Sequence, residues 1–202
     1  MRWRLACLVG CVLLLGFDLA APSLDGRAAR ASTSVELSLA DLLRLSTLVT
    51  VGTTAEQTSV WEDADGNRSR RIVTYTRVRL ERVLDGRPPA GSDVWVRTLG
   101  GQVGDIGQHV DGEAVLVPLQ KSLVFLRARA DGTHAVAGMA QGHFPLKVLR
   151  AGEPPRIALS PAIGRLVEGG SPSSAPARAL LDSKTVDEAE RIIMGERRNR
   201  AR

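Results

Sequence analysis

The sequence predicts a mainly β protein built around a small antiparallel OB-like β-barrel, with a short N-terminal helix and a C-terminal helix after a linker. Three observations lead to this prediction. Residues 36–160 contain at least five short runs rich in Val, Thr and aromatic residues, Asp-Gly and Gly-Gly pairs separate the runs, and no helical crossovers alternate with them. A β-sandwich is the alternative, because the pattern alone does not count the edges of a sheet.

The first 31 residues have the features of a signal peptide. Two arginines precede an apolar run that ends at Phe17, and this run is shorter than the roughly 20 residues needed to cross a bilayer core. Small residues at 29 and 31 predict cleavage before Ser32, which would place the mature chain in the periplasm or outside the cell. Lipidation at Cys11 and an uncleaved membrane anchor are the alternatives.

Both cysteines of the chain, Cys7 and Cys11, lie within this leader. A chain cleaved near residue 31 would therefore have no thiol nucleophile, no disulfide and no thiolate metal ligand. Its domain must then be held together by the apolar core, and about 125 residues can bury enough surface for this.

The elements of the domain follow from local patterns. Ser38 can cap the start of a helix with its hydroxyl, and Asp41 places a carboxylate three residues later. Leucines at helical spacing follow, so the segment predicts a short helix. Strand-like runs then follow, with turn residues between them, at 49–61, 71–84, 93–98, 122–129, 135–139 and 144–149.

The C-terminal region changes composition. Residues 167–177 are rich in Gly, Ser and Pro and predict a linker. A capping box at Thr185 and Glu188 predicts an amphipathic helix, so residues 178–202 are expected to form a helix with a basic tail. We expect the linker to isolate this tail from the barrel, so that its loss would cost the barrel little.

The net charge of +5 does not indicate a nucleic-acid-binding face. The excess of arginine lies in the leader and after residue 190, whereas residues 32–190 carry 18 basic and 19 acidic side chains. Single-strand binding also requires exposed aromatic platforms in a positive groove. After the leader the aromatic residues lie mostly in strand-like runs and are expected in the core; they are Trp61, Tyr75, Trp95, Phe125 and Phe144.

Residues 36–150 contain a series of short strings in a fixed order. These are Val51-Gly52-Thr53, Arg71-Ile72-Val73-Thr74, Val83-Leu84-Asp85-Gly86, Gly100-Gly101, Gly104-Asp105-Ile106-Gly107-Gln108, Val124-Phe125-Leu126 and Val136-Ala137-Gly138-Met139-Ala140-Gln141-Gly142. In this order they resemble a family of uncharacterised exported bacterial proteins, which implies an exported all-β domain and carries over no catalytic residue. The domain also loosely resembles netrin-like and metalloproteinase-inhibitor barrels, although the N-terminal cysteine of the inhibitors is missing here.

The glycine-rich segment after residue 99 is the main candidate for binding. It lacks the order of a dinucleotide fingerprint and the lysine of a P-loop, so a phosphate cradle is not expected. A bulged crossing with close backbone packing is one interpretation. The other is a recognition loop on a rigid barrel, and its candidate binding residues are Gly101, Gly104, Asp105, Gln108 and His109.

A calcium loop is a weaker alternative at Asp63, Asp65 and Asn67, which occupy alternate positions. The glycine and the glutamate that an EF-hand needs later in its loop are replaced by Arg68 and Thr74, so a hairpin turn is preferred.

Familiar catalytic motifs do not occur in the sequence. The three histidines, His109, His134 and His143, have no zinc-site spacing and are expected at the surface or at strand ends, and no serine lies in a nucleophile elbow. We expect a non-enzymatic, exported binding module without a cofactor or metal, whose partner is another exported protein or a surface polymer. The alternatives are an inhibitor or targeting partner of an exported protease, and a hydrolase with an unfamiliar site.

Overall fold

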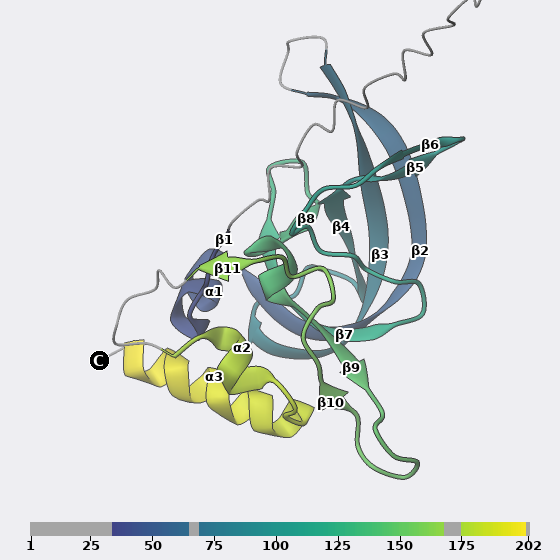
Figure 1. The fold of residues 1–202 in the computed structure, drawn as a ribbon. Coiled ribbons are helices and arrows are strands. Elements are labelled where there is room, and N and C mark those ends of the chain that lie inside the picture. The colour runs from purple at the N-terminus through teal and green to yellow at the C-terminus, as the bar shows by residue number, and fades with distance from the viewer. Residues whose placement is uncertain (1–33, 65–68, 168–174, 201–202) are drawn as a thin grey trace, which may run out of the picture. The chain divides into compact units, whose positions relative to one another are not determined.

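A computed structural model describes residues 34–64, 69–167 and 175–200. Five of its strands form a closed ring (Figure 1). Around the ring these strands are β2 (Leu48–Ala64), β3 (Ser69–Gly86), β4 (Asp93–Leu99), β8 (His134–Val136) and β7 (Lys121–Ala128), which returns to β2. Because the sheet closes on itself, the structure is a barrel and the β-sandwich alternative does not apply.

The ring has the strand order of an OB-like barrel. If β2, β3, β4, β7 and β8 are numbered 1 to 5 in chain order, their order around the ring is 1-2-3-5-4. Four of the five junctions between neighbouring strands are antiparallel. The fifth junction, between β4 and β8, is parallel and consists of the single pair Val96↔His134. The expected antiparallel sheet therefore has one parallel seam, where the barrel closes.

The remaining elements surround this ring. Strands β9 (His143–Lys147) and β10 (Arg156–Ile157) extend the sheet outward from β7, and β1 (Ser34–Val35) pairs in parallel with β11 (Leu166–Val167). A separate hairpin joins β5 (Gly101–Val103) to β6 (Ile106–Gln108). The helices are α1 (Leu39–Leu45), a 3₁₀ turn η1 (Met139–Gly142), α2 (Ala177–Leu181) and α3 (Val186–Arg200).

Both predicted helix caps are present. The Ser38 hydroxyl accepts a hydrogen bond from the Asp41 backbone amide at 3.1 Å, and it donates one to the Asp41 carboxylate. At the start of α3, the Glu188 carboxylate accepts from the Thr185 amide at 2.8 Å, as a capping box requires. The expected strand at 135–139 is shorter than predicted, because Gly138 has a left-handed backbone and η1 begins after it.

The apolar side chains form two clusters on opposite faces of the barrel wall. The interior cluster fills the ring and consists of Leu48, Val78, Val94, Val96, Ala114, Leu116, Val124, Leu126 and Val136. The outer cluster lies between β2, β7, β9 and the three α-helices, where Phe125 and Phe144 meet edge to face with ring centroids 5.9 Å apart. The two-residue period of a strand explains this division, since Val49 and Val51 face the helices whereas Leu48 faces the interior.

The C-terminal helices belong to the domain core, which corrects the expectation of an isolated tail. Ile193 of α3 and Leu181 of α2 are fully buried in the outer cluster. Ionic contacts hold the polar side of α3 to the sheet: Arg82 of β3 pairs with Asp187 at 2.5 Å, and Arg197 binds Asp85. Composition does not reveal whether the helix after residues 167–177 docks, because docking depends on an apolar face of the barrel that distant residues build.

The predicted leader (1–31), with Cys7 and Cys11, lies outside the described residues, as does most of the predicted linker. Among the helices that the structure describes, none combines the length and apolar character needed to cross a membrane.

Candidate functional site

A cavity of about 570 Å³ lies above the interior cluster, between the outer parts of β2, β3 and β4 and the hairpin β5–β6. The hairpin runs beside the far half of β2 and β3 (Figure 1). Ala114 and Leu116 belong both to the interior cluster and to the cavity wall, so the packed core forms its floor. The polar side chains of the wall are Gln57, Ser59, Thr74, Thr98, Gln102, Gln108, His109 and Glu113.

The inward-facing side chains of the strands change from apolar to polar along the barrel axis. On β3 the alternate residues Val78, Thr76 and Thr74 point inward in turn, and on β4 Val96 is followed by Thr98. The strands therefore build an apolar core at one level and a polar chamber at the next.

An irregularity in β2 brings Gln57 to this chamber. Thr54 pairs with Val78 and Gln57 pairs with Thr76, so β2 uses one residue more than β3 between these pairs. The Gln57 amide then donates hydrogen bonds to the Thr76 hydroxyl at 3.0 Å and to the Leu116 carbonyl. Gln57 thereby fastens the segment after residue 109 to the barrel wall.

A pair of hydroxyls faces Gly101 at the root of the hairpin. The Ser59 and Thr74 oxygens are 2.9 Å apart, and Thr74 donates to the Gly100 carbonyl at 2.7 Å. A Cβ atom at residue 101 would lie 2.2 Å from the Thr74 oxygen and 2.6 Å from the Ser59 oxygen, and φ there is +129°. Only glycine fits this position without displacing the hydroxyl pair.

Gln108 completes the hydrogen bonding of β3 where the ladder with β4 ends. The Ile72 carbonyl accepts from the Gly100 amide at 2.8 Å, and the Ile72 amide donates to the Gln108 side-chain oxygen at 2.6 Å. This oxygen is therefore occupied within the fold, and the Gln108 side-chain NH₂ is the group left for other contacts.

The five predicted binding residues separate into two places. Gly101, Gln108 and His109 line the cavity, whereas Gly104 and Asp105 form the exposed turn of the hairpin and do not line it. His109 lies at the rim, where its Nε2 is 3.2 Å from the Asp111 carboxylate. The expected loop after residue 99 is thus a hairpin whose root, and not its turn, reaches the chamber.

Glu113 is the acidic group of the cavity wall. Burial raises the pKa of its carboxyl group, and backbone hydrogen bonds from Ala114 and Leu99 and the charge of Arg97 offset part of this effect. No ion pair joins Glu113 to a cation among the described residues.

The nearest buried cation is already paired. Arg97, with 6% of its side chain exposed, forms a two-nitrogen contact with Glu62, which also accepts a hydrogen bond from Tyr75. These bonds lower the pKa of Glu62 and raise that of Tyr75. The guanidinium of Arg97 therefore forms its ion pair with Glu62.

A buried serine–histidine pair lies elsewhere in the fold. His143 Nε2 is 3.1 Å from the Ser122 oxygen, and the two residues are 1% and 2% exposed. Burial lowers the pKa of His143 to about 4, so the ring is neutral at pH 7. Its Nδ1 has no partner among the described residues. A catalytic pair needs access for substrate and an orienting group on the histidine, and this pair has neither within the described chain.

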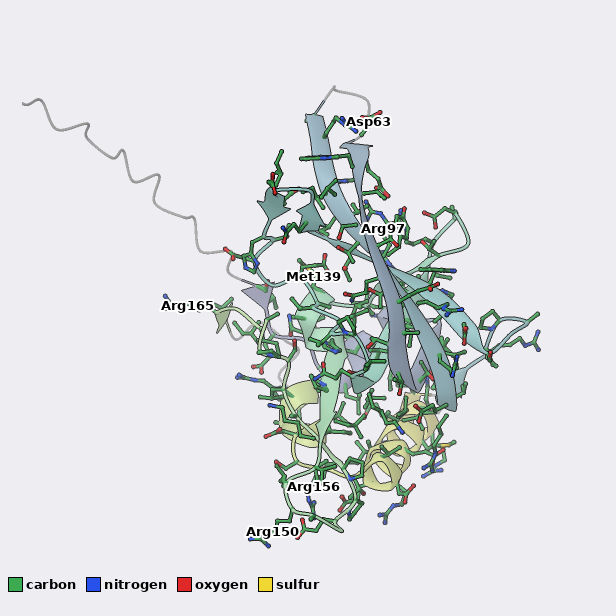
Figure 2. All side chains as sticks on the ribbon, turned by 90° about the vertical axis from the view of Figure 1, so that its right-hand side faces the viewer. Asp63, Arg97, Met139, Arg150, Arg156 and Arg165 are labelled. Atoms are coloured by element: carbon green, nitrogen blue, oxygen red, sulfur yellow. The ribbon has the colours of Figure 1, made fainter. Side chains whose placement is uncertain are left out.

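The candidate calcium residues are only partly described. Asp63 lies near the far end of β2 (Figure 2), with 84% of its side chain exposed and one carboxylate oxygen 3.9 Å from Arg70. Asp65 and Asn67 lie outside the described residues. Within the part of the chain that the structure describes, no three metal-ligating side chains are grouped.

Sequence reasoning missed Gln57, Ser59, Thr74 and Glu113. The available signal was the threonine at alternate positions 74 and 76 of β3, but threonine is enriched in strands in general and does not by itself identify the inward face. Glu113 lies outside the regular elements, so no periodicity indicated its direction.

Comparisons of the chain with protein-family models, curated proteins and solved structures found no match.

Proposed function

We propose that the chain is an exported, non-enzymatic binding module whose ligand site is the polar cavity above the interior cluster. The observation that carries this proposal is a chamber of about 570 Å³, within the usual size range of ligand sites, whose wall groups are fixed by internal hydrogen bonds. Such groups keep their positions without a ligand, so little ordering free energy is lost on binding.

The proposal that the module binds without catalysis is supported by the placement of its reactive groups. The Ser122–His143 pair is closed off from solvent. The cavity wall presents hydroxyl and amide groups, one carboxyl group and, at its rim, the imidazole of His109, whose Nε2 lies 3.2 Å from Asp111. Export is supported by the leader pattern of the sequence. The partner would be another exported protein or a surface polymer that offers a small polar group to the chamber.

The test is a matched pair of substitutions at exposed valines. Val115 is 50% exposed and lines the cavity, so Val115→Trp should fill the chamber mouth while leaving the fold intact. Val148 is 63% exposed and lies away from the cavity, so Val148→Trp adds the same surface elsewhere.

Partners should be captured from an envelope extract with the immobilised wild-type protein and identified by mass spectrometry and glycan analysis. Capture should be lost with Val115→Trp and retained with Val148→Trp. Equal capture by both variants would show that the cavity is not the binding site.

A further inference from the structure

The hydrogen-bond donors of the chamber are largely used by the wall itself. Thr74 donates to the Gly100 carbonyl, so Ser59 must donate to the Thr74 oxygen in their 2.9 Å contact. Thr98 donates to the Thr74 carbonyl at 3.4 Å, and the Gln57 NH₂ donates to Thr76 and Leu116.

The hydrogen-bond acceptors of the chamber, by contrast, still have unused lone pairs. The Gln57 side-chain oxygen has no partner among the described residues, and the Ser59 oxygen keeps lone pairs after donating its proton. Glu113 accepts from the Ala114 amide at 3.0 Å and from the Leu99 amide, and a carboxylate, with about four lone-pair sites, keeps acceptor capacity after two such bonds. A ligand that satisfies these groups must bring hydrogen-bond donors.

The charge of the Glu113 carboxylate also favours a cationic ligand in the chamber. A half-buried carboxyl group without a direct ion-pair partner is unfavourable. Glu113 has no such partner among the described residues, because Arg97, whose charge offsets only part of the burial effect, is paired with Glu62. A cation placed in the chamber would supply the missing charge and would gain charge-assisted hydrogen bonds there.

We propose that the chamber takes an ammonium or guanidinium group on an aliphatic stem, with Glu113 as its counter-ion and Gln57 and Ser59 as further acceptors. This inference rests on the proposed function and names the ligand class for the same site. The stem would lie against Leu99, Val115 and Leu116, which line the chamber with apolar surface. A lysine or arginine side chain and a free polyamine share this chemistry.

The Gln108 NH₂ favours the side chain of a peptide over a bare amine. The side-chain oxygen of Gln108 accepts a hydrogen bond from the Ile72 amide. This bond leaves the Gln108 NH₂ to donate to a carbonyl beside the cationic stem. A peptide provides such a carbonyl, whereas a polyamine does not.

The experiment is an NMR titration of the purified protein, following backbone amides at Ser59, Gly101 and Ala114. The probes are Nα-acetyl-arginine amide, Nα-acetyl-lysine amide and spermidine, with Nα-acetyl-citrulline amide and a chitin trisaccharide as neutral comparisons. We expect the two cationic amino-acid probes to bind about tenfold more tightly than the citrulline probe, because only they form a charge-assisted bond. Tighter binding of spermidine than of either amino-acid probe would identify a free amine as the source of the cation.

The matched variants are Glu113→Gln and Glu196→Gln, which remove the same charge inside the chamber and on α3. Glu113→Gln should weaken binding of the arginine probe about tenfold, and Glu196→Gln should leave it unchanged. The comparison of arginine with citrulline uses the wild-type protein, so the test survives even if Glu113→Gln fails to fold.

Equal affinity for arginine and citrulline, or an unchanged affinity in a folded Glu113→Gln variant, would overturn the cation assignment. Binding of the trisaccharide alone would also overturn it, yet would leave the cavity as the binding site. If no probe binds, the cation assignment fails, and partner capture by the Val115→Trp and Val148→Trp variants still decides the proposed function separately.

Discussion

The imidazole of His143 lies in the core, with its Nε2 3.1 Å from the Ser122 hydroxyl and its Nδ1 without a partner among the described residues. Burial lowers its pKa from 6.5 to about 4, because the charged ring would lose its hydration there. In the unfolded chain the same ring titrates near its ordinary value. The unfolded state therefore binds the proton first as the pH falls.

His143 should make the protein less stable in mild acid. Between pH 6.5 and pH 4 the free energy of unfolding should fall by about 3 kcal/mol through this group, since each unit of pKa difference corresponds to about 1.4 kcal/mol. Urea unfolding at pH 7, 5.5 and 4 measures the slope. The slope should be reduced in His143→Gln and unchanged in His109→Gln, which alters a largely exposed ring. Equal slopes in the wild type and His143→Gln would contradict the assignment.

At the scale of elements, the hairpin β5–β6 is held to the barrel by its root. Gly100 donates to the Ile72 carbonyl, Gln108 accepts from the Ile72 amide, and Gly101 lies flat against the Ser59 and Thr74 hydroxyls. The turn at Gly104 faces open space. The position of the cavity wall is therefore set by a few contacts at the root, while the turn can vary.

Gly101→Val should strain this root. A valine there requires an unfavourable positive φ and would drive its side chain into the two hydroxyls, so we expect a loss on the order of 3 kcal/mol of unfolding free energy. Gly104→Ala is the control: it has space for its methyl group and should lose only about 1 kcal/mol for its left-handed backbone. Chemical denaturation measures both. A Gly101→Val variant as stable as Gly104→Ala would show that the root is not constrained.

At the scale of the whole molecule, the outer cluster joins regions that are far apart in the chain. Leu39 and Leu42 of α1 are buried together with Ala189 and Ile193 of α3, and both helices pack against the outer face of the barrel wall. The helices thus cover an apolar face of the sheet that would otherwise meet water, and the cavity lies on the other side of that wall.

Two neighbouring residues of α3 test this docking. Ile193 is fully buried and Met194 is 46% exposed. Ile193→Ala should lower the unfolding free energy by about 3 kcal/mol through lost burial and a new cavity, whereas Met194→Ala should change it by less than about 0.5 kcal/mol. Thermal and urea unfolding of the two variants decide the matter. Similar stabilities would restore the picture of a tail that is independent of the barrel.

The sequence allowed the barrel strands, the first helix and both caps to be predicted because each leaves a local pattern of alternation or capping. The docking of α3 and the short strands β5 and β6 could not be predicted in this way. Three-residue strands that each contain a glycine carry almost no alternation, and docking depends on a surface built by distant residues. The same limit applies to the site, since Ser59 and Glu113 come to the wall of one cavity only in the folded barrel.

The outer cluster also has a consequence for the order in which the chain can fold. During synthesis the β2–β3 hairpin is complete once residue 86 has emerged, but the cluster begun by Leu39 lacks Ile193 until more than a hundred further residues have followed. For that interval one face of the growing sheet stays open to water and to any chaperone that recognises apolar surface. The outer cluster therefore reaches its final packing only after α3 has been made.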